Sequence, residues 1–290
     1  MFSKKALFLN HMSMKNIKLV ATDLDGTFLR NDRTISNRNL EALHQLGNKG
    51  ILRVAATGRN LKKVREVIQH DVPFDYIIYS SGAGIFNWQE DQNIFQQNIG
   101  FEPATLLSDY FREKDYNFSV FAPAPHNHRL WFHKGGEECE EFNRFFSFHD
   151  SWSEQLPGNG FFREGLCQFL LIIPEDEESF SKLKKEIEIQ SDQIRVIRSS
   201  SPVTKGYIWV EVFHHEVSKG KGVQHLCTLL SIQPEETIGI GNDYNDIDLL
   251  NFTAHSFVAD NAPGPVKYWY HAVPSNEEDA FFHAVQPLLT

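Results

Sequence analysis

Residues 19–27 read Leu-Val-Ala-Thr-Asp-Leu-Asp-Gly-Thr, and this stretch decides the fold. The apolar residues before Asp23 favour a buried strand, and Gly26 lets the backbone turn sharply out of a sheet. In open α/β sheets, ligands bind beyond the carboxyl ends of the strands. We therefore expect Asp23 at that edge and Asp25 in the turn to face one ligand site. A nucleophile paired with an acid/base group is what phosphoryl transfer through a covalent intermediate requires. An Asp-rich turn with ordinary capping is the alternative for this stretch taken alone.

The first third of the chain alternates between strand and helix patterns. Leu40, Leu43 and Leu46 share one face of a predicted helix, which Ser36 can cap and Gly50 can end. Strands are predicted at 17–22, 51–56 and 76–79, and helices at 37–49 and 61–70. A β-α-β-α-β run with short connections predicts a parallel, doubly wound sheet.

The middle of the chain has a different pattern and predicts a second, inserted α+β domain. Strands are predicted there at 94–95, 118–121, 130–132, 169–173 and 194–197, and helices at 103–114 and 177–190. The α/β pattern returns with helices at 218–230 and 277–289 and strands at 237–240 and 256–259. The expected fold class is α/β, with a Rossmann-like core over 15–84 and 212–290 and the insertion over 85–211. Residues 1–14 are predicted to be a disordered extension.

Composition excludes several classes of function. The net charge of −10 and the lack of a long Lys/Arg cluster argue against nucleic acid as a partner. No apolar run is long enough to span a membrane. Cys139, Cys167 and Cys227 are too far apart in the sequence for a zinc site or a disulfide framework, which fits a cytoplasmic protein. An acidic chain needs a local device, such as a metal ion or one placed lysine, to hold an anionic substrate.

Three further stretches place polar groups where predicted strands end or a helix begins. Residues 56–59 read Ala-Thr-Gly-Arg, residues 218–220 read Ser-Lys-Gly, and residues 241–247 read Gly-Asn-Asp-Tyr-Asn-Asp-Ile. Together with residues 23–27 they resemble, in order, the four motifs of the haloacid dehalogenase-like phosphatases. The place of the insertion is similar to the Cof-type subfamily, which carries a large type IIB α+β cap.

The resemblance implies a role for each motif. Asp23 would be the nucleophile that forms an aspartyl-phosphate, and Asp25 the general acid/base. The phosphate and substrate would be held by Thr57, Gly58, Arg59, Lys219 and Asn245. Lys221 is the alternative cation to Lys219, and Arg59 either reaches the substrate phosphate or points outward.

The fourth motif departs from the family's usual Gly-Asp-x-x-Asn-Asp order. The resemblance implies a Mg²⁺ ion held by Asp23, by the backbone carbonyl of Asp25 and by the fourth motif. Asn242 stands where the family has its first Asp, and it can offer only an uncharged amide oxygen. Asp243 could supply the carboxylate instead, so both residues are candidate ligands.

The expected function is a Mg²⁺-dependent phosphatase acting on small phosphorylated metabolites, with sugar phosphates first and nucleotide or cofactor phosphates next. A dehalogenase does not need Asp25, and a transport ATPase needs membrane spans. The alternatives left open are a phosphomutase on the same fold and a non-catalytic sensor of phosphorylated metabolites, for which Asn242 is the one supporting feature. The oligomeric state has no signal in the sequence.

Two clusters of side chains in the insertion give weaker indications of function. His126, His128 and His133 could bind metal, but surface histidines in a Pro-rich loop, or contacts for a polar substrate, are the favoured interpretations. An aromatic group is interpreted as core of the insertion rather than a substrate pocket: Phe145, Phe146, Phe148, Trp152, Phe161 and Phe162.

Overall fold

The structure is a computed structural model that describes residues 14, 16–136, 138–147, 152–158 and 163–289. The predicted extension over residues 1–14 lies, except for Met14, outside these described residues. The chain forms two compact units, Met1–Phe95 with Ser218–Thr290, and Gln96–Val217. Each unit is described below by itself.

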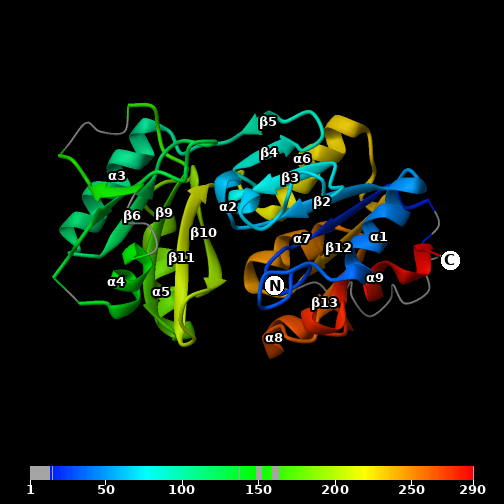
Figure 1. Cartoon of the computed structure of the whole chain (residues 1–290). Helices are drawn as coiled ribbons and strands as arrows, with labels where there is room; N and C mark the ends of the chain where they lie inside the picture. Colours follow the sequence, from blue (N-terminus) through cyan, green and yellow to red (C-terminus); the bar gives the residue numbers. More distant parts are fainter. Residues whose placement is uncertain (1–13, 15, 137, 148–151, 159–162, 290) are drawn as a thin grey trace. The chain divides into compact units, whose positions relative to one another are not determined.

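The first unit is built on an eight-stranded sheet in the order β14-β13-β12-β1-β2-β3-β4-β5 (Figure 1). Pairing is parallel from β14 through β3, and β4 runs antiparallel to β3. The strands are β1 (Leu19–Thr22), β2 (Leu52–Ala56), β3 (Tyr76–Tyr79), β4 (Gly84–Asn87), β5 (Gln92–Gln96), β12 (Thr237–Gly241), β13 (His255–Ala259) and β14 (His271–Val273). The predicted parallel, Rossmann-like sheet is thereby confirmed.

Helices and short turns connect these strands. They are α1 (Asn37–Asn48), α2 (Leu61–Arg65), η2 (Ser80–Gly82), α6 (Lys219–Leu230), η4 (Pro234–Glu236), η5 (Tyr244–Asp246), α7 (Ile247–Phe252), α8 (Gly264–Lys267), η6 (Asn276–Glu278) and α9 (Ala280–Leu289). Val223, Leu226 and Cys227 of α6 pack with β1 and β2 residues such as Leu19 and Val54 in one apolar cluster. This packing holds the start of α6 close to the ends of the strands, because burial of apolar surface is the main stabilising term.

Two predicted helices are shorter than expected. The helix predicted at 61–70 ends at Arg65, where the backbone N–H groups of Val67 and Ile68 both donate to the carbonyl of Val64. The helix predicted at 277–289 begins at Ala280. Asp279 has a φ of 65°, a left-handed conformation that separates α9 from the preceding η6 turn.

The predicted helix α1 is confirmed, but its buried face differs from the prediction. Ser36 caps it as expected, because its side chain accepts from the backbone N–H of Asn39. Leu43 and Leu46 are buried, whereas Leu40 is only half-buried. Asn39 is fully buried instead.

The second unit is a six-stranded sheet in the order β10-β11-β9-β6-β7-β8, antiparallel except for the β7–β8 pair. Its elements are α3 (Phe101–Glu113), β6 (Phe118–Phe121), β7 (Leu130–His133), α4 (Glu140–Ser147), β8 (Ser153–Gln155), β9 (Gln168–Pro174), α5 (Glu177–Glu188), β10 (Ile194–Ser200) and β11 (Tyr207–His214). Phe111 of α3 and Ile187 of α5 belong to one apolar core with alternate strand residues such as Phe169 and Val210. Both helices therefore cover the same face of this sheet.

The boundaries of the second unit differ from the predicted 85–211. Residues 84–95 join the first sheet, because Tyr76 of β3 pairs with Asn87 of β4 and β5 follows β4. The strand predicted at 94–95 is thus the end of β5 rather than part of the insertion. Residues 212–214 join the second sheet, because β11 pairs with β10 as far as His214 opposite Ile194.

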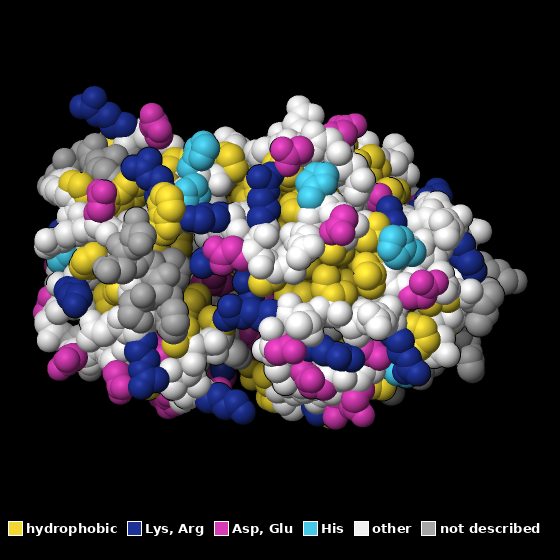
Figure 2. All heavy atoms as spheres, in the orientation of Figure 1, with side chains coloured by type: hydrophobic (Ala, Val, Ile, Leu, Met, Phe, Trp, Pro, Cys, Tyr) yellow, Lys and Arg dark blue, Asp and Glu magenta, His cyan; other side chains and the backbone are white. Residues whose placement is uncertain are grey.

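The surface carries charges of both signs. On the face shown in Figure 2, Lys and Arg side chains are interspersed with Asp and Glu side chains. No helix within the described residues has the length and apolar character needed to cross a membrane.

We expect Asn39→Leu to lower the free energy of unfolding by about 2–4 kcal/mol, because it leaves one buried and one part-buried backbone group without a partner. In the structure, Asn39 Nδ2 donates to the Phe28 carbonyl at 3.0 Å, and the N–H of Phe282 donates to Asn39 Oδ1 at 3.1 Å. Urea denaturation followed by circular dichroism measures the change. Asn37→Leu, on the exposed side of the same helix, is the matched control and should change stability little; equal effects would contradict the bridging role.

Candidate active site

The predicted site residues gather at one edge of the first sheet. Strand β1 lies between β12 and β2 and is parallel to both. The carboxyl ends of the three strands therefore meet: Asp23 follows β1, Thr57 follows β2 and Asn242 follows β12. The N–H of Asp23 donates to the Ile240 carbonyl, so the sheet ladder itself fixes the start of the first motif.

The ammonium of Lys219 is the centre of the site. Its side chain is 1% exposed, and Nζ donates to Asp23 Oδ1 at 2.6 Å, to Asp246 Oδ1 at 2.6 Å and to Asn245 Oδ1 at 3.2 Å. Lys219 is the first residue of α6, and Ser218 caps that helix by accepting from the N–H of Lys221. The structure thus brings Lys219, rather than Lys221, to Asp23.

Burial and charge act in opposite directions on these groups. Burial raises the pKa of Asp23 to about 8, although the Lys219 ammonium lowers it, and the neighbouring carboxylates Asp246 and Asp25 raise it further. Burial by itself lowers the pKa of Lys219, but the carboxylates of Asp23 and Asp246 together raise it above its usual value. Lys219 therefore stays charged, whereas burial favours the protonated form of Asp23.

Asp246 holds the fourth motif in shape, a role that the sequence interpretation missed. It is fully buried, and Oδ2 accepts from the N–H groups of Asn242 at 2.8 Å and Asp243 at 2.9 Å. Its position at the end of the Asn-Asp pair was visible in the sequence, but the tight turn that makes these bonds was not. Asp243 and Asp246 form a capping box around η5, so Asp243 is engaged with its own turn.

Asn242 faces the first motif. The Thr27 hydroxyl donates to Asn242 Oδ1 at 2.9 Å. The same end of the amide lies 2.9 Å from the Asp25 carbonyl oxygen and 3.3 Å from Asp23 Oδ2. An amide nitrogen at this position would donate to all three groups, whereas an amide oxygen would face two other acceptors. Gly26, with φ of 74°, makes room for this contact, because a Cβ there would lie 2.5 Å from Asn242 Nδ2.

Arg59 pairs with Asp25 instead of pointing outward. Arg59 Nε donates to Asp25 Oδ2 and Nη2 to Asp25 Oδ1, each at 2.6 Å. This bidentate geometry fixes the plane of the Asp25 carboxylate, which is half-exposed. The guanidinium is therefore placed to orient the proposed acid/base group, and its reach to a substrate phosphate stays a prediction.

The turn η2 supports the second motif and was also missed. Thr57 is buried, and its Oγ1 accepts from the Arg59 N–H at 3.1 Å. The N–H of Ser81 donates to the Thr57 carbonyl, and that of Ser80 to the Arg59 carbonyl. In the sequence, the signal for the turn η2 was its position directly after the predicted third strand. The end of that strand lies at the same sheet edge as the ends of the strands before Asp23 and Thr57.

The two clusters predicted in the insertion lie in the second unit. No group of three or more His, Cys, Asp or Glu side chains in the described part of the chain is arranged to hold a metal ion, so the histidine cluster gains no support as a metal site. His126 is exposed. Phe145 is buried against Phe121 and Trp209, as expected for core, whereas Trp152 is 48% exposed. Phe148, Phe161 and Phe162 lie outside the described residues.

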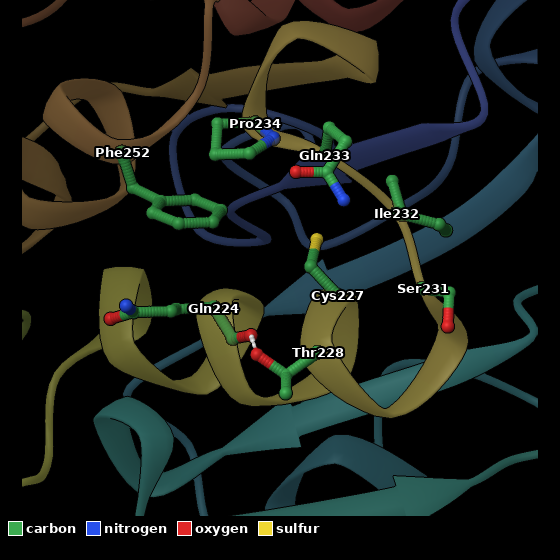
Figure 3. Close-up of a pocket in the computed structure, with 8 residues that line it drawn as sticks. All are labelled: Gln224, Cys227, Thr228, Ser231, Ile232, Gln233, Pro234 and Phe252. Carbon is green, nitrogen blue, oxygen red and sulfur yellow. Dashed lines mark hydrogen bonds between the residues drawn. The ribbon is translucent and has the colours of Figure 1, made fainter.

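A separate cavity of about 350 Å³ lies at the C-terminal end of α6 (Figure 3). It is lined by Gln224, Cys227, Thr228, Ser231, Ile232, Gln233, Pro234 and Phe252. Burial raises the pKa of the Cys227 thiol to about 11, which keeps it protonated and poorly nucleophilic. Lys219 begins the same helix and Ser231 follows its end, so this cavity is not the place where the predicted catalytic groups meet.

Comparisons with known proteins agree with this geometry. The family model for haloacid dehalogenase-like hydrolases matches residues 20–285. Among curated proteins of Bacillus subtilis (strain 168), phosphatase YwpJ is 25% identical over 290 residues, covering 94% of this chain and 100% of that protein. The 5-amino-6-(5-phospho-D-ribitylamino)uracil phosphatase YcsE is 24% identical over 275 residues, covering 93% and 95%.

Solved structures show the same fold. BT1666 from Bacteroides thetaiotaomicron, from the phosphatases of the haloalkanoate (HAD) enzyme superfamily, matches with a TM-score of 0.76 at 18% identity, covering 94% of this chain and 96% of that chain. The HAD subclass IIB sugar phosphatase BT4131 matches with a TM-score of 0.71 at 20% identity, covering 93% and 98%. The family match spans nearly all of both units, and the relatives support a phosphatase. The chain belongs to the haloacid dehalogenase-like hydrolase family.

Proposed function

We propose that this protein is a Mg²⁺-dependent phosphatase that hydrolyses small phosphorylated metabolites through a phosphorylated Asp23. The observation that carries the proposal is the buried Lys219 ammonium, which bridges Asp23 and Asp246 at the edge where Thr57 and Asp25 also lie. A buried ion pair adds little net stability because its desolvation is costly, and groups with strongly shifted pKa values cluster at functional sites. An incoming phosphoryl group would meet a nucleophile, a cation and a hydroxyl together.

The chemistry follows from the side chains present. A carboxylate oxygen of Asp23 forms a bond to phosphorus while the bond from phosphorus to the leaving oxygen breaks, and Asp25 donates a proton to that oxygen. Asp25 then takes a proton from a water whose oxygen bonds to phosphorus, which releases inorganic phosphate and restores Asp23. Arg59 holds the Asp25 carboxylate in one orientation for both proton transfers. Lys219 and Thr57 stabilise negative charge on the other phosphoryl oxygens.

The oxygen groups at the sheet edge fit a magnesium ion. Octahedral Mg²⁺ ligands lie at 2.0–2.1 Å from the ion, which places neighbouring ligands about 3 Å apart. The near end of the Asn242 amide is 2.9 Å from the Asp25 carbonyl oxygen and 3.3 Å from Asp23 Oδ2. These three groups would hold the ion, with Asn242 turned so that its oxygen faces it. A bound Mg²⁺ would offset repulsion between the Asp23 carboxylate and a phosphate.

Between the two candidate ligands of the fourth motif, we favour Asn242. Its side chain already contacts the first motif, whereas the Asp243 carboxylate caps η5. The ion would then be held with one negative charge fewer than the family's usual aspartate provides.

The second unit is our candidate for the cap that selects the substrate. Every proposed catalytic group lies in the first unit, which leaves the second unit, inserted between the second and third motifs, without a role in the chemistry itself. We propose sugar phosphates as the first class to test, in line with the sugar phosphatase BT4131, followed by phosphorylated ribityl compounds, in line with YcsE.

We expect the protein to release phosphate from a panel of sugar phosphates, nucleotides and p-nitrophenyl phosphate, and to lose this activity when EDTA removes Mg²⁺. Asp23→Asn should lower kcat by more than about 10³-fold, because the amide cannot act as nucleophile. Asp32→Asn removes an exposed carboxylate of the same loop region and is the matched control.

Two outcomes would contradict the phosphatase. Activity that survives in Asp23→Asn would exclude a covalent role for this residue. A folded wild-type protein that binds phosphosugars but turns none over would favour the sensor, and interconversion of sugar phosphates without phosphate release would favour a phosphomutase.

We expect Asn242→Asp to bind Mg²⁺ roughly tenfold more tightly, because metal affinity rises with the charge of the ligand set. In EDTA the same variant should melt at a lower temperature than the wild type, since a carboxylate at this position faces the Asp25 carbonyl and Asp23 Oδ2. Isothermal titration with Mg²⁺ and thermal melting provide both readouts without a substrate.

Asp243→Asn serves as the comparison. It should leave Mg²⁺ affinity within about twofold of the wild type, because an uncharged residue at 243 removes no ligand in this arrangement. A large loss of affinity in Asp243→Asn together with no gain in Asn242→Asp would reverse the assignment of the two residues.

A further inference from the structure

Ser81 has a buried hydroxyl with no hydrogen-bond partner among the described residues. The residue is 0% exposed, and Oγ is one of two such serine hydroxyls in the described part of the chain, the other being that of Ser119 in β6. Buried polar groups are nearly always satisfied, because an unpaired one keeps its full desolvation cost. An exception beside a candidate active site therefore calls for a partner that is not part of the folded chain.

The backbone at this point is also strained. Ser80 and Ser81 have φ values of 48° and 54°, and Gly82 follows with 103°. Serine rarely adopts this left-handed conformation, and consecutive cases cluster at functional sites, where the surrounding structure has to hold them. Here the N–H of Ser81 donates to the Thr57 carbonyl, and Gly82 packs so closely on Ser218 that a Cβ would lie 2.2 Å from the Ser218 carbonyl oxygen. The turn is thus fixed between the second and third motifs.

The Ser81 hydroxyl lies close to Gly58 of the second motif and to Asn245 of the fourth. A Cβ placed on Gly58 would lie 3.6 Å from Ser81 Oγ and 3.8 Å from Asn245 Nδ2. The missing side chain of Gly58 therefore leaves a space with two polar side chains on its borders. The other end of the Asn245 amide accepts from Lys219 Nζ at 3.2 Å, so this space adjoins the Lys219 ammonium.

We infer that Ser81 is a further substrate-binding residue, whose hydroxyl donates to an oxygen of the phosphoryl group held between Gly58, Asn245 and Lys219. The inference rests on the proposed phosphatase function. The strained turn places the hydroxyl there, and the phosphoryl oxygen completes the hydrogen bond that the folded chain leaves open. A phosphoryl oxygen is a strong acceptor, so the bond is charge-assisted.

The test measures phosphate binding and stability in the same variants. Ser81→Ala should weaken binding of inorganic phosphate, measured by titration calorimetry with Mg²⁺ present, by roughly 10-fold to 100-fold, as expected for a lost bond to a charged group. The melting temperature without phosphate should be equal to or higher than that of the wild type, because the substitution removes an unsatisfied buried group. Phosphate should raise the melting temperature of the variant less than that of the wild type.

Two further variants distinguish the effect of losing the Ser81 hydroxyl from the effect of the strained backbone. Ser81→Gly also removes the hydroxyl but suits the left-handed conformation, so it should lose phosphate affinity as Ser81→Ala does while gaining stability. Ser119→Ala removes the other unpaired serine hydroxyl, in the second unit, and should leave phosphate affinity unchanged.

The outcomes distinguish this inference from the proposed function. Wild-type protein that neither binds nor releases phosphate would overturn both. Wild-type activity with unchanged phosphate affinity in Ser81→Ala and Ser81→Gly would overturn only the role of Ser81. A fall in the melting temperature of phosphate-free Ser81→Ala with unchanged affinity would show that the hydroxyl serves the fold instead.

Discussion

The first unit depends on one interaction, the burial of the Lys219 ammonium between the carboxylates of Asp23 and Asp246. A charge that is 1% exposed is stable only if its partners lie within hydrogen-bond distance. Asp23 follows β1, Lys219 begins α6, and Asp246 ends the turn after β12. Meeting this single requirement therefore fixes two strand ends and a helix start in one place, and the catalytic geometry follows from it.

The same requirement sets the charge of the site. With Asp23 ionised, as its proposed role as nucleophile requires, three carboxylates (Asp23, Asp25 and Asp246) face two cations (Lys219 and Arg59), so a phosphate ester would add to an excess of negative charge. Two factors would reduce this excess of negative charge. A divalent cation bound beside Asp23 would remove it, and the uncharged Asn242 keeps it one unit smaller than an aspartate would. If Asn242 holds the proposed cation, the departure from the family motif would weaken both the attraction for the cation and the repulsion of the substrate.

Local sequence patterns predicted the candidate site well where a polar motif directly follows an apolar strand. Asp23 and Thr57 follow such strands, Lys219 was expected beside them from the resemblance to the family's motifs, and the structure brings all three to one edge. The sheet to which β4 and β5 belong depends on pairing with β3, which no local pattern reveals. Strand β11 was missed because buried Glu211 interrupts its apolar character; that carboxylate is satisfied by the Ser199 hydroxyl at 2.6 Å, a partner from another strand. Strain at Ser81 was likewise invisible, since serine carries no signal for a left-handed backbone.

The proposed catalytic groups all lie in one of the two units. Asp23, Asp25, Thr57, Lys219 and Asn242 all belong to the first unit, and the bonds between them are made within it. The second unit has its own apolar core, which is complete without any of these residues. If the second unit selects the substrate, as proposed, changes there could alter which substrate is accepted without disturbing the network around Lys219. Four short motifs in the first unit were therefore enough to predict the reaction from the sequence, whereas no comparable motif in the second unit predicted the substrate.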